Sequence, residues 1–162
     1  MMLGDRVVII GNRGSGKSTL ARDVGRLLEC QAHDLDRIHW QVGIGLKRDE
    51  DQARSLVSAA AADPRWVIEG VFGWLAAVAL PSATSLVWLD MPWTVCRDGL
   101  ASRGPSVGAT EAQHAELLAW AEAYWRRSTS SSFAGHRDMF DNFAGAKHRL
   151  MKRSDVAALL AR

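Results

Sequence analysis

The stretch RVVIIGNRGSGKSTL, residues 6–20, decides how this chain folds. It opens with an arginine and four consecutive β-branched residues, a composition typical of a strand buried on both faces of a sheet. After the glycines, the apolar residues Leu20, Val24, Leu27 and Leu28 recur at helical spacing. The segment between them therefore joins a buried strand directly to a helix with one apolar side.

The glycine-rich segment matches the pattern GxxxxGK[ST] through Gly11, Gly16, Lys17 and Ser18. Glycines let backbone N–H groups point inward around an anion, and the following helix adds the positive end of its dipole. We therefore predict a phosphate-binding loop in which Lys17 reaches the β- and γ-phosphates and Ser18 ligates Mg²⁺. The nucleotide-binding residues are predicted to be Gly11, Asn12, Arg13, Gly14, Ser15, Gly16, Lys17, Ser18 and Thr19.

Strand and helix patterns alternate along the rest of the chain. Further strands are indicated at residues 30–36, 65–70, 85–90 and 147–152. Helices are indicated at residues 47–63, 73–80, 92–103, 111–127 and 133–144, with a last helix capped by Ser154. This alternation predicts an α/β fold with a parallel sheet and helices on both of its faces. With 162 residues and no linker or repeat, we expect a single domain over residues 1–162.

Neither the charge balance nor the hydropathy of the chain indicates a nucleic-acid or membrane partner. Twenty basic and 18 acidic residues give a formal charge of +2, which does not favour nucleic acid or a membrane as partner. No apolar run approaches the roughly 18 residues that a membrane span needs. Two cysteines without CxxC spacing are expected to be reduced thiols, and the chain opens directly on a strand without a leader pattern. These features predict a cytoplasmic protein.

The surroundings of the loop narrow the class of nucleotide-binding protein. Motor-type and AAA-type ATPases usually have a strand that ends in Asp-Glu, and neither VWLDMP nor WVIEGV does. The Asn-Lys-x-Asp motif expected of a GTPase is absent from the sequence. The small-molecule kinases remain.

Four segments carry a resemblance to a known group: GNRGSGKSTLA, DLDRIHW, WVIEGVFGWL and LVWLDMPW. Through them the chain resembles the adenylate-kinase-like and shikimate-kinase-like P-loop kinases, and most closely the group labelled DNA topology modulation proteins. The resemblance implies a three-layer αβα P-loop NTPase fold with a five-stranded parallel sheet, and ATP with Mg²⁺ as cofactors. It also implies a short mobile lid after the fourth strand, at approximately residues 97–127.

Three acidic residues follow predicted strands. Asp34 and Asp36 form a D-x-D at the end of the second strand, where shikimate kinases have a similar pair. The resemblance implies that one acid serves the acceptor hydroxyl and the other the metal, and we favour Asp36 for the acceptor and Asp34 for the metal; which is which stays open, and helix-capping or solvated acids are the alternative. Glu69 matches the acid of the Asp-Gly segment in adenylate kinases, which reaches the Mg²⁺ water shell or the acceptor. A purely structural ion pair is the alternative for Glu69.

Arginines follow the fourth predicted strand and close the long predicted helix. Arg97, Arg103 and Arg126 are candidates to neutralise charge on the phosphoryl group during transfer. Together with Lys17 and Asp36 they are the predicted catalytic residues. For each arginine the alternative is a solvated side chain without a catalytic role.

The acceptor side offers weaker signals. Trp40, Trp74 and Trp93 lie near motif ends and could form an aromatic acceptor wall, although core packing explains them equally well. Residues 126–136 could supply a second polar surface. Residues 73–83 contain no arginine, whereas nucleotide monophosphate kinases usually hold the acceptor phosphate there with one.

Five histidines, none at metal-ligand spacing, are expected at the surface or at helix ends: His33, His39, His114, His136 and His148. The favoured function is ATP-dependent phosphoryl transfer to the hydroxyl of a small-molecule acceptor. The alternatives are a nucleoside or nucleotide kinase and a nucleotide-dependent binding or regulatory protein with little turnover. Acceptor identity, ATP against GTP and oligomeric state stay open.

Overall fold

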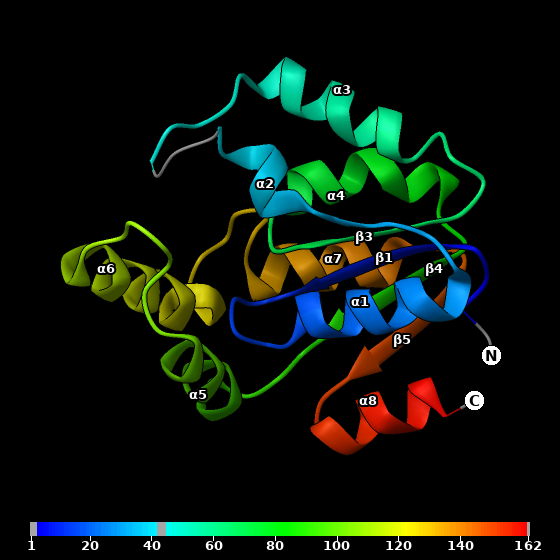
Figure 1. Cartoon of the computed structure of the whole chain (residues 1–162). Helices are drawn as coiled ribbons and strands as arrows, with labels where there is room; N and C mark the ends of the chain where they lie inside the picture. Colours follow the sequence, from blue (N-terminus) through cyan, green and yellow to red (C-terminus); the bar gives the residue numbers. More distant parts are fainter. Residues whose placement is uncertain (1–2, 42–44, 162) are drawn as a thin grey trace.

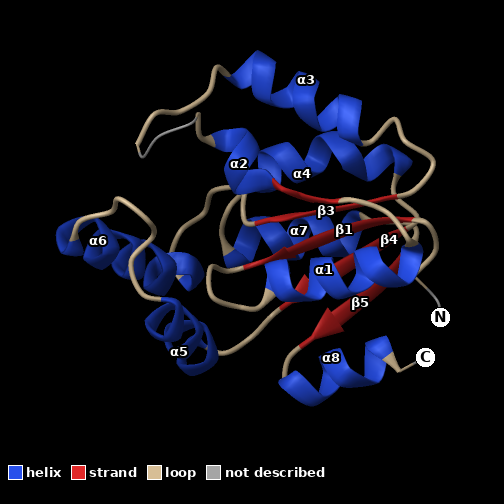
Figure 2. Cartoon of the chain, viewed as in Figure 1, coloured by secondary structure: helices blue, strands red, loops and turns tan. Residues whose placement is uncertain are grey.

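A five-stranded parallel sheet lies at the centre of the computed structural model, which describes residues 3–41 and 45–161. The strand order is β2-β3-β1-β4-β5. The strands are β1 (Arg6–Gly11), β2 (Ala32–Asp34), β3 (Trp66–Gly70), β4 (Ser85–Leu89) and β5 (Ala146–Leu150). Helices cover both faces of this sheet (Figure 2), so the predicted three-layer α/β fold is confirmed. Residues 1–2, 42–44 and 162 of the predicted single domain lie outside the described residues.

Eight α-helices and two 3₁₀ turns are found within the described residues. The helices are α1 (Lys17–Leu28), α2 (Leu35–His39), α3 (Glu50–Ala60), α4 (Gly73–Ala79), α5 (Trp93–Arg103), α6 (Glu111–Glu122), α7 (Phe133–Asn142) and α8 (Arg153–Leu160). The turns are η1 (Leu80–Ser82) and η2 (Ala123–Trp125). In Figure 1, α5 and α6 project beyond the carboxyl ends of the strands, whereas the two chain termini lie at the opposite end.

The central strand β1 separates two hydrophobic cores. Val8 and Ile10 point to the face covered by α3, α4 and α7, and Val7 and Ile9 point to the face covered by α1 and α8. All four side chains are fully buried. Each such burial stabilises the fold by roughly 1.5–3 kcal/mol relative to an exposed side chain. The run of four β-branched residues therefore supplies apolar surface to both layers at once.

Three local features differ from the sequence-based predictions. The short helix α2 was not predicted. The predicted helix over residues 111–127 stops at Glu122 and continues as the turn η2. Ser154 lies inside α8 rather than at its cap, because the Asp155 carboxylate accepts the N–H groups of Met151 and Lys152 and so starts the helix earlier.

A buried polar network connects β3, β4, η2 and α7. The His136 Nε2–H donates to the Val71 carbonyl over 2.8 Å, which leaves His136 Nδ1 to accept from the Tyr124 hydroxyl at 2.7 Å. The Tyr124 oxygen accepts in turn from Trp88 Nε1 at 3.2 Å. His136 is fully buried, so the prediction of a surface or capping histidine is wrong at this position. Burial lowers the pKa of His136 to about 4, which keeps its imidazole neutral.

Among the residues that the structure describes, no helix is long and apolar enough to cross a membrane.

We predict that Tyr124→Phe destabilises the protein by about 1–3 kcal/mol, because the Trp88 N–H and His136 Nδ1 both lose a buried partner while the ring packing is kept. Urea unfolding followed by fluorescence measures the free-energy change. The control is Glu122→Gln, at an exposed position at the end of α6, which is expected to stay within about 0.5 kcal/mol of wild type. A Tyr124→Phe protein as stable as this control would contradict the structural importance of the network.

Candidate functional site

The loop between β1 and α1 is shaped by two glycines with positive φ. Gly14 has φ 77° and Gly16 has φ 99°. A Cβ atom at Gly14 would lie 2.2 Å from the Cys96 carbonyl oxygen, and one at Gly16 would lie 2.5 Å from Arg153 Nη1. Gly14 therefore requires glycine for conformation and for space, whereas Gly16 requires it for its positive φ, since the Arg153 side chain could move aside. The loop is packed from outside by α5 and α8, which leaves its inner side for a ligand.

Lys17 closes over the inside of this loop. Its Nζ donates to the Asn12 carbonyl oxygen at 2.7 Å, and the residue is only 8% exposed. Burial lowers the pKa of Lys17, while the charge of Glu69 acts in the opposite direction. The Asn12 carbonyl also accepts from the Ser15 hydroxyl at 2.7 Å. An ammonium group is thus buried at the place where the motif predicts contact with phosphate.

Parallel strand pairing aligns the predicted metal-side residues. Ile10 of β1 pairs with Gly70 of β3, which places Glu69 beside the start of α1. The Ser18 hydroxyl donates to Glu69 Oε1 at 2.9 Å. In the next strand, Asp34 pairs in register with Glu69. Ser18, in the first turn of α1, therefore lies with Asp34 and Glu69 at the carboxyl edge of the sheet, and their role toward a metal stays a prediction.

Burial makes these carboxyl groups weaker acids than usual. Burial raises the pKa of Glu69 to about 7, against the opposing charge of Lys17. It also raises the pKa of Asp34, and the charge of Asp36 acts in the same direction. Asp34 Oδ1 accepts from the Asp36 N–H at 2.8 Å and so caps α2, the structural alternative considered for this acid.

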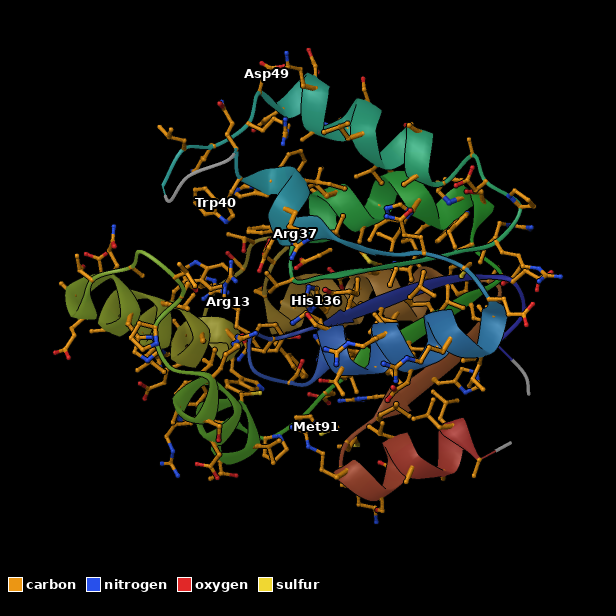
Figure 3. All side chains as sticks on the ribbon, viewed as in Figure 1. Arg13, Arg37, Trp40, Asp49, Met91 and His136 are labelled. Carbon is orange, nitrogen blue, oxygen red and sulfur yellow. The ribbon has the colours of Figure 1, made fainter. Side chains whose placement is uncertain are left out.

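Asp36 forms an ion pair with an arginine of the phosphate loop. Arg13 Nη1 lies 2.9 Å from Asp36 Oδ2. The guanidinium carbon is 5.6 Å from the ring centre of Phe72 and 5.2 Å from that of Trp120. Figure 3 shows Arg13 near the carboxyl edge of the sheet, on the side of α6. The nucleotide loop and the candidate acceptor acid are therefore in direct contact.

The arginines predicted to be catalytic lie in different surroundings. Arg103 lines the cleft with the phosphate loop, Asp36 and Glu69. Arg97 is exposed and pairs with Asp98 at 3.6 Å, and Arg126 is exposed directly after η2; neither lines this cleft. The catalytic roles of all three remain predictions.

Arg153 is a cleft residue that sequence reasoning missed. It is the first residue of α8, and its Nη1 donates to the Ser15 carbonyl of the phosphate loop at 2.9 Å. It lines the same cleft as Arg103. Its place directly after the last predicted strand was the available signal, since the carboxyl ends of parallel strands gather at one edge of the sheet.

Aromatic side chains gather beside the Arg13–Asp36 pair. The His39 ring stacks on Phe72 with centroids 3.8 Å apart, and it meets Trp40 and Trp74 edge-on at 4.5 and 5.9 Å. Trp93, the third predicted wall residue, instead contacts Trp125 at 6.3 Å. Trp40 and Trp74 thus lie together near the acceptor side, and Trp93 does not.

The donor groups at the cleft fit Mg²⁺ bound mainly through phosphate and water. Among the described residues there is no group of three or more His, Cys, Asp or Glu that could enclose a metal ion. Mg²⁺ prefers oxygen ligands, retains several waters and commonly binds through one or two carboxylates plus substrate phosphates. The Ser18 hydroxyl and Glu69 line the cleft and offer such oxygens, and Asp34 lies beside Glu69 in the next strand but outside this lining. The buried Lys17 and the inward-facing loop suit the phosphates themselves.

A scan against protein-family models found no match, and no curated protein matched the chain. Solved structures do match. A gluconokinase from Sinorhizobium meliloti 1021 aligns with a TM-score of 0.60 at 14% identity over 100% of this chain and 94% of that one. The chain shares the fold of P-loop kinases. A sugar kinase from Janibacter sp. HTCC2649 aligns with a TM-score of 0.55 at 18% identity, over 96% of this chain and 90% of that one. A shikimate kinase from Bacteroides thetaiotaomicron aligns with a TM-score of 0.55 at 19% identity, over 98% of this chain and 95% of that one.

We predict that the carboxyl group of Glu69 makes stability depend on pH. Its pKa of about 7 in the folded state exceeds the ordinary 4.5, so the folded protein binds the proton more tightly. The contribution of Glu69 to the free energy of unfolding is therefore greatest below about pH 4.5, and it declines as the pH rises through about 7. Glu69→Gln removes this decline, which is on the order of 3 kcal/mol at most.

Thermal unfolding from pH 5 to 8 measures this effect, with wild type expected to lose more stability across the range than Glu69→Gln. The control is Glu116→Gln, which replaces an exposed carboxyl on α6 and is expected to leave the wild-type profile unchanged. Parallel profiles for wild type and Glu69→Gln would show that Glu69 does not titrate in this range.

Proposed function

We propose that the protein is an ATP-dependent kinase that transfers the γ-phosphoryl group to a hydroxyl of a small-molecule acceptor. One observation carries this proposal: phosphate-loop, metal-side and acceptor-side residues line a single cleft. Its lining includes Lys17, Ser18, Glu69 and Asp36. The shared fold with gluconate, sugar and shikimate kinases supports the same conclusion.

The phosphate loop would hold the nucleotide. Its backbone N–H groups and the Lys17 ammonium would bind the phosphate oxygens, and Ser18 with Glu69 and Asp34 would hold Mg²⁺ directly or through water. Bound Mg²⁺ supplies charge neutralisation on the phosphates. The closed cleft floor around Lys17 keeps its charge poorly solvated, which strengthens its attraction to an anion.

Asp36 would orient the acceptor. As the acceptor oxygen forms its bond to the γ-phosphorus, the bond to the β,γ-bridging oxygen breaks and ADP leaves with that electron pair. The hydroxyl proton passes to the Asp36 carboxylate. Arg103 and Arg153 line the cleft and would stabilise the negative charge of the transferred group. Catalysis would thus rest mainly on positioning and charge.

The lid is proposed to comprise approximately residues 97–127, which contain most of α5 and all of α6. The loop between these helices contains Gly104 and Gly108, both with positive φ. Closure of these helices would exclude water from the cleft. Arg97 and Arg126 lie within this segment and stay candidates for contact with the phosphoryl group after closure.

Three further expectations belong to the same proposal. The motif resemblance to the group labelled DNA topology modulation proteins stays a hypothesis, because a formal charge of +2 gives no support for a DNA partner. A cytoplasmic location fits a metabolite kinase, and the two cysteines are free thiols. The lack of arginine in residues 73–83, which contain α4 and η1, disfavours a nucleotide monophosphate kinase, and a nucleoside kinase stays an alternative.

We predict that Lys17→Ala weakens Mg·ATP binding at least about tenfold and lowers ADP release by about 100-fold or more, because the loop loses its only ammonium group. Calorimetry measures the binding, and an ADP assay over a panel of hydroxyl compounds measures the activity. The exposed Lys47→Ala is the matched control. Absence of heat with both Mg·ATP and Mg·GTP would refute nucleotide binding. Tight binding without any acceptor phosphorylated would favour the regulatory alternative.

A further inference from the structure

The Arg13–Asp36 pair carries two unsatisfied polar atoms. Arg13 Nη1 bonds Asp36 Oδ2, but Arg13 Nε and Asp36 Oδ1 are both buried and make no hydrogen bond to any described residue. Leaving one buried polar atom unpaired costs about 1–3 kcal/mol, so such atoms need an explanation. Here an unpaired donor and an unpaired acceptor occur on the same ion pair, at the lining of the cleft. That arrangement indicates a ligand group.

The chemistry of the two atoms restricts that ligand group. Arg13 Nε can only donate, and an ionised Asp36 Oδ1 can only accept. A hydroxyl group satisfies both, since it accepts and donates at once. A carboxylate or phosphate oxygen could accept from Arg13 but would face Asp36 Oδ1 with another lone pair and a like charge. Hydroxyl groups therefore fit this pair better than acidic groups.

The charge of Arg13 is already balanced. Asp36 neutralises it at 2.9 Å, and stacking between Phe72 and Trp120 confines the guanidinium. The neighbouring Arg127 lies 3.8 Å from the Trp120 ring centre and donates to the carbonyl oxygens of Trp120 and Ser131, while its Nε is a further buried atom without a hydrogen bond to any described residue. The Arg13–Asp36 pair is therefore neutral as a unit, and the other arginines of the cleft lining, Arg103 and Arg153, are assigned to the phosphoryl group in the proposed function.

Other groups beside the pair are neutral or balanced too. Arg54 stacks on Trp74 and pairs with Glu50 and Asp51 on α3. Burial lowers the pKa of His39, which keeps its ring uncharged at neutral pH. The His39 ring stacks on Phe72 and meets Trp74 edge-on, so the surroundings of the pair are aromatic and not charged.

We propose that the Arg13–Asp36 pair selects an uncharged polyhydroxy acceptor, a cyclic sugar or cyclitol, over its carboxylate counterpart. This inference rests on the proposed kinase function and names the substrate class for the same site. It also assigns Arg13 a role in acceptor specificity, in addition to its place in the nucleotide loop.

Matched acceptor pairs test the charge preference. D-glucose against D-glucuronate and D-glucitol against D-gluconate differ mainly by one carboxylate. The readouts are kcat/KM with Mg·ATP, and thermal shift in the presence of Mg²⁺ and a non-hydrolysable ATP analogue. Wild type is expected to favour a neutral member by about tenfold or more over its acidic counterpart.

Charge-altering variants test whether the pair sets this preference. Asp36→Asn leaves the charge of Arg13 uncompensated. The ratio of kcat/KM for the neutral member to kcat/KM for the acidic member is then expected to fall by about tenfold. Arg13→Met keeps apolar packing between the rings of Phe72 and Trp120 but leaves the charge of Asp36 uncompensated, so it should raise this ratio. The double variant restores neutrality and should return the ratio toward wild type. Arg65→Met removes an arginine at the opposite end of β3 and is expected to leave the ratio unchanged.

The outcomes separate this inference from the proposed function. Phosphorylation of gluconate or glucuronate in preference to the neutral member would confirm a kinase and overturn the inference. An unchanged ratio in Asp36→Asn, with wild-type thermal stability, would also overturn it. A thermal shift with a neutral member but no ADP release would support the inference while the kinase proposal failed. No shift and no turnover with any neutral member would overturn the inference.

Discussion

The close contact of the phosphate loop with its neighbours is the constraint on which the rest of the site depends. Gly14 meets α5 so closely that a Cβ at Gly99 of that helix would lie 2.4 Å from the Gly14 carbonyl oxygen. On another side, Arg153 occupies the space that a side chain at Gly16 would need. Backbone packing therefore holds the loop on the α5 side, and Gly14 and Gly16 both line the cleft. The phosphate loop and α5, which are far apart in the sequence, can approach each other this closely because Gly14 and Gly99 have no side chains.

Parallel pairing then places the acids in a row beside this loop. Glu69 and Asp34 end neighbouring strands, so the register that buries Val7 to Ile10 also sets the positions of the carboxyl groups. Burial raises the pKa of both acids, and Lys17 is the buried cation that offsets their charge. A buried cluster of this kind is costly without a partner, which fits a site whose charges are completed by a metal and phosphates.

The sequence predicted well what depends on local pattern. The β-branched run, the glycine spacing and the strand–helix alternation predicted the sheet, the loop and Lys17. It did not predict what depends on side chains meeting across elements. Arg153 reaches the loop from 138 residues away, and His136 is buried because Val71 and Tyr124 happen to complete its hydrogen bonds. Neither contact leaves a periodic signal, so only the assembled structure reveals it.

Two successive loop residues connect the nucleotide side to the proposed lid. Asn12 Nδ2 donates to the Ala121 carbonyl of α6 at 2.9 Å, and Arg13 packs on Trp120 of the same helix. Any change in loop shape on nucleotide binding must therefore be felt at the end of α6, and a shift of α6 must be felt in the loop, because coupling between two sites is reciprocal. Since Arg13 also bonds Asp36, the acceptor side joins the same connection. The nucleotide loop, the proposed acceptor acid and the proposed lid thus all contact Arg13, so the proposed function would couple their binding energies at this residue.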